Sequence, residues 1–115
     1  MGDLSIPIHN SKQQLLDAES MSAPIISGPV LVDDVNCWAV HLIWEDGTAV
    51  AGDLVVSGSV SGEVYTDLSV TTIASNSGSI MYDPGAAVGY SYFRVEWRPV
   101  TADSNLTVWY NTKII

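Results

Sequence analysis

The sequence predicts an all-β domain, an antiparallel β-sandwich of jelly-roll-like type with an extended N-terminal arm. Roughly six to eight short segments rich in Val, Ile, Thr and aromatic residues follow residue 24, separated by Gly, Pro, Asn and Asp turn signals. The longer segments alternate apolar and polar side chains with the period of a strand. No convincing helical pattern follows residue 24, so two sheets must cover each other's apolar faces.

Residues 1–24 differ from the rest of the chain and are predicted to form the arm, with the sandwich domain spanning residues 25–115. Residues 11–19 are a helix candidate, because a Ser suited to an N-cap begins them and a Gln stands three residues later. Their apolar content is small, and an isolated helix of this kind is marginal in water. We therefore expect Leu15 and Leu16 to pack the arm on its own domain or on a neighbouring subunit.

The β-sandwich is predicted to begin with short strands at residues 25–26 and 30–32, which Gly28-Pro29 separates. Residues 37–60 then predict a broad hairpin, because Asp46-Gly47 suits a tight turn between two strand patterns. The strand before the turn places four large apolar side chains on one face, namely Trp38, Val40, Leu42 and Trp44.

Four further strands are expected at residues 63–73, 79–82, 89–98 and 106–113, and Pro99 ends the third of them. The last strand is apolar on both faces, so it contributes either Leu106 with Val108 or Trp109 to the core. The remaining predicted core residues are Trp38, Val40, Leu42, Trp44, Leu54, Val56, Phe93, Val95 and Trp97.

Charge is scarce and strongly unbalanced in this chain. Charged residues make up 15% of it, against about 25% in an average soluble domain. The net charge of −9 argues against nucleic-acid binding and against docking on anionic membranes, since both need clustered Lys and Arg. A surface with so few charges favours coverage by other subunits, so we expect a homo-oligomer, for which a trimer is one candidate.

No constellation predicts a catalytic site, a cofactor or a metal centre. Cys37 is the only cysteine, which excludes an intrachain disulfide, and His9 and His41 lack the spacing of a catalytic or zinc-binding group. Acidic pairs at residues 33–34 and 45–46 leave a Ca²⁺ site open, although Asp at a turn more often bonds local backbone. We also expect neither a signal peptide nor a membrane-spanning segment.

Aromatic side chains are the best candidates for a binding surface. Alternation in residues 89–98 places Tyr90 and Tyr92 on the face opposite the core, and Trp109 or Tyr110 is exposed on the last strand. Tyr and Trp are enriched at subunit interfaces, which is the favoured interpretation, and a carbohydrate platform is the alternative. Alternating charges beside them are expected to pair across the sheet face. The interface candidates are Tyr90, Tyr92, Arg94, Arg98, Trp109, Tyr110, Leu15 and Leu16.

A series of strand motifs runs through most of the chain. His-Leu-Ile-Trp at residues 41–44 precedes Gly-Asp-Leu-Val-Val-Ser at residues 52–57, and Tyr-Thr-Asp-Leu follows at residues 65–68. Tyr-Ser-Tyr-Phe-Arg-Val-Glu-Trp comes next at residues 90–97, before a final hairpin that ends in Lys, at residues 106–113. This series resembles the small β-sandwich virion structural proteins of tailed bacteriophages, of the decoration, cement or tail-associated type.

The resemblance implies a non-enzymatic structural protein of the virion, assembled in the host cytoplasm. A capsid decoration or cement role is the leading expectation, and a tail or neck component is the next. The implied partners are other copies of the chain, the major capsid protein and other virion proteins. The alternative from another functional class is a β-sandwich module that binds a carbohydrate or a host receptor.

Overall fold

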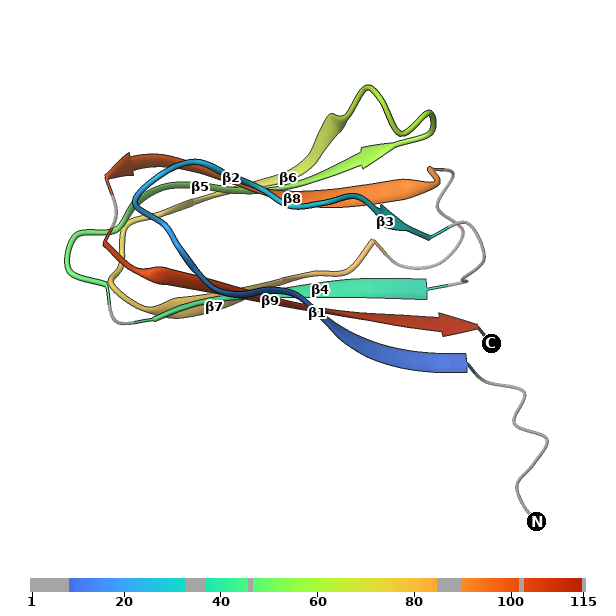
Figure 1. Cartoon of the computed structure of the whole chain (residues 1–115), viewed down its shortest axis with the longest axis horizontal. Helices are drawn as coiled ribbons and strands as arrows, with labels where there is room; N and C mark the ends of the chain where they lie inside the picture. The colour runs from blue at the N-terminus through green and yellow to red at the C-terminus, as the bar shows by residue number, and fades with distance from the viewer. Residues whose placement is uncertain (1–8, 33–36, 46, 85–89, 102, 115) are drawn as a thin grey trace, which may run out of the picture.

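The computed structural model of the chain describes residues 9–32, 37–45, 47–84, 90–101 and 103–114. The described residues form nine β-strands and no helix. The strands make two antiparallel sheets that pack face to face (Figure 1). The predicted all-β sandwich is therefore confirmed.

Sheet I has the strand order β1 (His9–Ser20), β9 (Asn105–Ile114), β4 (Cys37–Glu45) and β7 (Gly78–Tyr82). Sheet II has the order β2 (Ile25–Ile26), β8 (Tyr92–Thr101), β5 (Ala51–Ser59) and β6 (Thr66–Ile73), and β3 (Val30–Leu31) also pairs with β8. Because β2 and β3 pair with successive parts of β8, they fill one strand position between them. Two four-position sheets linked in this way form a jelly-roll-like sandwich.

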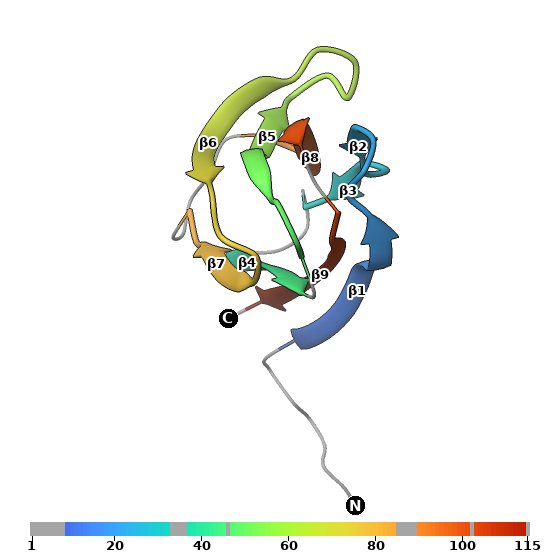
Figure 2. The same ribbon diagram turned by 90° about the vertical axis from the view of Figure 1, so that its left-hand side faces the viewer.

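The core lies between the two sheets, as Figure 2 shows from one end of the sandwich. All nine of the core residues predicted from strands β4, β5 and β8 are buried. Strand β9 contributes Leu106 and Val108, which are both fully buried, and turns Trp109 to the opposite face. This resolves the alternative that the sequence left open for the last strand.

The helix predicted at residues 11–19 is wrong, because this segment lies within strand β1 and pairs with β9 along its length. The register shifts on either side of Leu16, and Ala18 adopts a φ of 49°. These irregularities let the adjacent Leu15 and Leu16 both pack against the core. Pairing with β9 supplies the backbone hydrogen bonds that a short polar helix would have had to make alone.

The hairpin predicted at residues 37–60 is also wrong, because β4 lies in sheet I and β5 lies in sheet II. Each strand has one apolar face, and the two faces cover each other across the core instead of lying side by side in one sheet. The N–H of Gly47 donates to the carbonyl of Asn76 at 2.9 Å, which ties this connection to the one between β6 and β7. Asp46 lies outside the described residues.

Hydrogen bonds join the connections at this end of the sandwich, which faces the viewer in Figure 2. The indole of Trp97 donates to the carbonyl of Met21 at 2.8 Å, and the indole of Trp44 donates to the carbonyl of Ser75 at 2.9 Å. The N–H of Met21 donates in turn to the carbonyl of Ser104 at 2.9 Å. Two buried indole N–H groups are thereby satisfied, which avoids the cost of burying a polar group without a partner.

Candidate functional site

The described residues contain no group of three or more His, Cys, Asp or Glu side chains placed to hold a metal ion. Three of the acidic residues behind the Ca²⁺ alternative, Asp33, Asp34 and Asp46, lie outside the described residues. Within those same ranges, no helix has the length and hydropathy to cross a membrane. The residues predicted to form an interface are considered next, by the sheet face on which they lie.

An ion-pair network lies on the outer face of sheet II. The guanidinium of Arg98 makes two hydrogen bonds to the carboxylate of Asp67, at 3.0 and 3.1 Å, and contacts Glu96 at 3.0 Å. The hydrogen bonds from Arg98 hold the pKa of Asp67 below its ordinary value, and the same contact raises the pKa of Arg98. The predicted pairing of charges across this face is confirmed for Arg98.

Arg94 makes a different contact on the same face. Its guanidinium carbon lies 4.1 Å from the centre of the Tyr65 ring, which is the geometry of a cation–π interaction. Arg94 and Arg98 therefore both make contacts within their own sheet. Their predicted role at a subunit interface remains a prediction.

Tyr90 and Tyr92 were both expected on this outer face, but their side chains point in different directions. Strand β8 begins at Tyr92, so Tyr90 precedes the strand and does not follow its alternation. The Tyr90 ring packs edge-on against Trp38, with ring centroids 6.0 Å apart, and burial raises its pKa. The predicted outward placement of Tyr90 is therefore wrong. Tyr92 does face outward, and its ring covers Gly62, where a Cβ atom would lie 3.1 Å from the ring.

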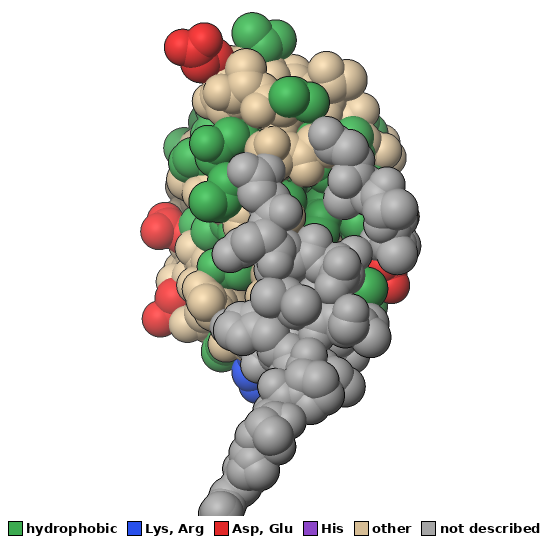
Figure 3. All heavy atoms as spheres, turned by 90° about the vertical axis from the view of Figure 1, so that its right-hand side faces the viewer, with side chains coloured by type: hydrophobic (Ala, Val, Ile, Leu, Met, Phe, Trp, Pro, Cys, Tyr) green, Lys and Arg blue, Asp and Glu red, His purple; other side chains and the backbone are tan. Residues whose placement is uncertain are grey.

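Exposed apolar side chains lie near Tyr92, where sheet II meets the β5–β6 connection. We call Leu31, Val60, Val64 and Tyr92 the loop-end patch. Leu31 pairs directly with Tyr92, and the three aliphatic side chains are 53%, 71% and 76% exposed. Figure 3 views this end of the molecule, where hydrophobic side chains lie among uncharged ones and a few acidic ones. Only Tyr92 of this patch was among the residues predicted from the sequence.

The neighbouring residues Trp109 and Tyr110 of β9 also point to opposite faces of sheet I. Tyr110 points inward, where its ring meets Phe93 edge-on at 5.6 Å and its hydroxyl donates to Gln13 Oε1. Trp109 points outward from sheet I, and the ammonium of Lys12 lies 4.9 Å from its ring centre. Only Trp109 of the two therefore belongs to an outer face. Leu15 and Leu16, the arm residues expected to make contacts, pack on the core of their own domain.

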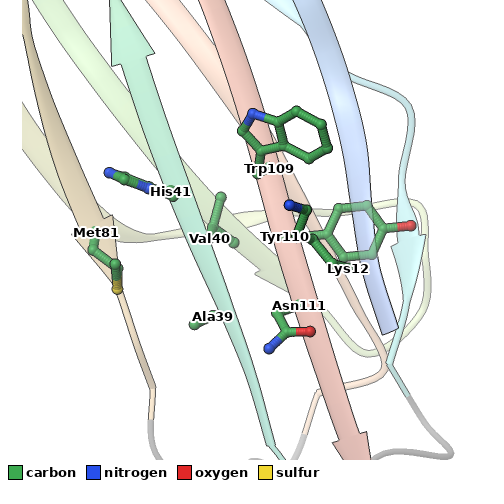
Figure 4. Close-up of a pocket in the computed structure, with 8 residues that line it drawn as sticks. All are labelled: Lys12, Ala39, Val40, His41, Met81, Trp109, Tyr110 and Asn111. Atoms are coloured by element: carbon green, nitrogen blue, oxygen red, sulfur yellow. The ribbon is translucent and has the colours of Figure 1, made fainter. Parts of the chain in front are cut away.

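A hollow of about 370 Å³ lies beside Trp109 on the outer face of sheet I (Figure 4). We call it the Trp109 hollow. Ala39 pairs with Asn111 and His41 pairs with Trp109, so neighbouring strands bring these side chains together. The small side chain of Ala39 leaves the space open. The residues that line the hollow are Lys12, Ala39, Val40, His41, Met81, Trp109, Tyr110 and Asn111.

The sequence reasoning missed most of the residues of this hollow. Alternation correctly placed His41 opposite the Trp38 stripe, but the meeting of Lys12, Asn111 and Ala39 depends on the pairing of β1 with β9 and of β9 with β4. A helical assignment for the first of these strands concealed that pairing. No signal in a single sequence specifies such a register between distant strands.

Comparisons with known proteins place the fold among proteins of several origins. The SPBc2 prophage-derived protein YomS superposes with a TM-score of 0.57 at 10% identity, over 97% of this chain and 99% of that one. The shared feature is the fold. VP2 of the infectious bursal disease virus subviral particle gives 0.59 at 9% identity, over 98% of this chain but 34% of that one.

A protein of the disulfide-linked pili of Bacillus endospore appendages gives a TM-score of 0.53 at 12% identity, over 98% of this chain and 97% of that one. No family model matches the sequence, and no curated protein matches it. These likenesses establish the architecture, since their sequence identities are too low to carry a function.

Proposed function

We propose that this chain is a non-enzymatic structural subunit of a phage virion, and that it acts as a capsid decoration protein. The observation that carries the proposal is the loop-end patch, in which three exposed aliphatic side chains lie at the end of sheet II that holds the outward Tyr92. The fold supports it as well, because it is shared with a prophage-derived protein and with a protein of a viral particle. In this proposal the chain works by contact alone and stabilises the particle by covering joints between subunits.

The physical argument starts from the cost of exposing apolar area. Burial of such area contributes about 25 cal/mol per Å², and monomeric proteins seldom leave clustered apolar side chains in water without a partner. Tyr92 supplies the kind of rigid aromatic anchor that dominates binding energy at interfaces. Low charge content adds support, since 15% charged residues leave an uncharged surface that is inexpensive to desolvate.

The partners proposed are the major capsid protein of the particle and further copies of this chain, as a trimer or another homo-oligomer. A tail or neck component is the runner-up position in the virion. Both positions use the same patch, and they differ in which virion protein the patch covers.

The proposal is tested by cosedimentation of the purified chain with empty shells of the major capsid protein of the same phage. We expect saturable binding, and a loss of at least about tenfold in affinity for the double variant Leu31→Ser/Val64→Ser, which removes apolar contact area. Val100→Ser is the matched control, because Val100 is 84% exposed at the opposite end of β8. Equal binding by the double variant and the wild type would refute the loop-end patch as the contact surface. An absence of binding by the wild type would refute the decoration role.

A further inference from the structure

The Trp109 hollow lies on the outer face of sheet I, whereas the loop-end patch lies where sheet II meets the β5–β6 connection. The two features share no residue, so both can be occupied at once. A subunit attached through sheet II would leave the hollow open to solvent. Its lining shows which class of molecule it fits.

The lining combines an aromatic ring with hydrogen-bond donors. Trp109 offers an indole face, and Lys12 lies against that ring with three N–H donors (Figure 4). The amide of Asn111, which also lines the hollow, adds two more N–H donors. Of the described side chains that line the hollow, none is Asp or Glu. The ligand must therefore carry an apolar face and several hydrogen-bond acceptors.

We propose that the Trp109 hollow binds a pyranose sugar that carries a carboxylate, such as a uronic or sialic acid unit of a glycan. The C–H face of the sugar ring packs on the indole of Trp109, whose electron-rich face attracts C–H groups. The carboxylate accepts hydrogen bonds from Lys12 and Asn111, and charge-assisted bonds of this kind are the strong ones. A hollow of about 370 Å³ is at the small end of ligand sites, which suits a mono- or disaccharide.

The acidic character of the whole protein does not exclude an anionic ligand. Although the net charge is −9, charges farther away than about 8 Å are largely screened at physiological ionic strength. Lys12 lies in the lining itself and makes no ion pair within the described residues, so its charge is available to the ligand. A second copy of the chain is a less suitable occupant, because the hollow is small and concave.

The test uses the full-length protein on an array of oligosaccharides that contain uronic or sialic acid units, together with their neutral counterparts. We expect binding to acidic glycans and at least about tenfold weaker binding to the neutral ones. Titration of Trp fluorescence with the best acidic glycan then gives its affinity in solution. A folded protein that binds no acidic glycan would overturn the proposal.

Two variants separate the roles of the lining residues. Trp109→Ala is expected to weaken binding of every sugar at least about tenfold, whereas Lys12→Met is expected to abolish the preference for the acidic form. Val100→Ser and the patch variant Leu31→Ser/Val64→Ser are expected to bind sugar as the wild type does, so failure of this site and failure of the particle role are distinguishable. If Trp109→Ala instead changed the native mass and left glycan binding intact, the hollow would be a contact between copies and the proposal would be wrong.

Discussion

The indole of Trp38 lies parallel to the ring of Phe93, with ring centroids 4.3 Å apart and an angle of 4° between their planes. Trp38 stands on β4 of sheet I and Phe93 on β8 of sheet II, so this stack joins the two layers of the sandwich. Tyr90 and Tyr110 meet the pair edge-on from either side. One aromatic cluster thus fixes how the sheets face each other.

Phe93→Ala is expected to lower the free energy of unfolding by about 3–5 kcal/mol, because it removes buried area and leaves a cavity beside Trp38. That loss is a large fraction of the about 5–15 kcal/mol by which a domain is stable. Urea unfolding followed by Trp fluorescence measures it. Val100→Ala, at an exposed site of the same strand, is the control and should change stability by less than about 0.5 kcal/mol. A loss below about 1 kcal/mol for Phe93→Ala would contradict the described core.

Gly52 is expected to tolerate no side chain. A Cβ atom there would lie 2.6 Å from the carbonyl oxygen of Arg98 and 2.6 Å from the indole of Trp97, so backbone would have to move. Gly52→Ala should therefore destabilise the fold by about 1–3 kcal/mol or more. Gly28→Ala is the matched variant, because a Cβ atom there meets nothing within 4 Å. Thermal melts that ranked the two variants equally would show that the packing at Gly52 is looser than described.

Ala18 should become more stable as glycine. Its φ of 49° lies in the left-handed region, which costs a residue with a Cβ atom about 1–2 kcal/mol and costs glycine almost nothing. Greater freedom of glycine in the unfolded chain offsets part of this, so Ala18→Gly is expected to raise stability by up to about 1 kcal/mol. Ala39→Gly, in the regular strand β4, should lower stability by about 0.5–1 kcal/mol. If both substitutions destabilised the protein, the bulge in β1 would not have the conformation described.

Asp67 should make a pH-dependent contribution to stability. Its pKa in the folded state is depressed, chiefly by the hydrogen bonds from Arg98, so the folded state favours the ionised carboxylate. The contribution is therefore fully present above the unfolded pKa of about 3.9 and is lost as the pH falls through the lower folded value.

The measurement compares wild type and Asp67→Asn in thermal melts between pH 7 and pH 2.5. The wild type should be the more stable of the two at pH 7, and the difference should shrink below about pH 4. Asp17→Asn, an exposed position on β1 in the other sheet, controls for the general effect of removing one acidic charge. A difference that stayed constant over this range would mean that the Arg98 contact does not select the ionised form.

The core could be predicted from the sequence because alternation with period two survives in β4, β5 and β8, whichever sheet each strand joins. Their partners could not be predicted, since alternation specifies which face of a strand is buried and says nothing of its neighbour. An Asp-Gly turn signal is compatible both with a hairpin and with a connection that crosses to the other sheet. The hairpin predicted at residues 37–60 was wrong for that reason.

The binding surfaces were predictable only in part, again for reasons of pairing. Alternation placed Tyr92 outward and left the direction of Trp109 open, whereas Tyr90 precedes its strand and turns to the core. Lys12 was assigned to a helix candidate, so its approach to Trp109 depends on a strand pairing that local sequence does not encode. Because β1 pairs with β9 along its length, residues 9–20 belong to sheet I of the sandwich and not to a separate arm.

The central claim is that the chain stabilises a virion by covering its subunits through the loop-end patch. The most direct measurement is the temperature at which empty shells of the partner capsid protein open, with the wild-type chain bound, with the Leu31→Ser/Val64→Ser variant, and without either. We predict that the wild type raises this temperature in a saturable manner and that the variant does not. An opening temperature that stays the same when the wild-type chain is present in excess would contradict the account.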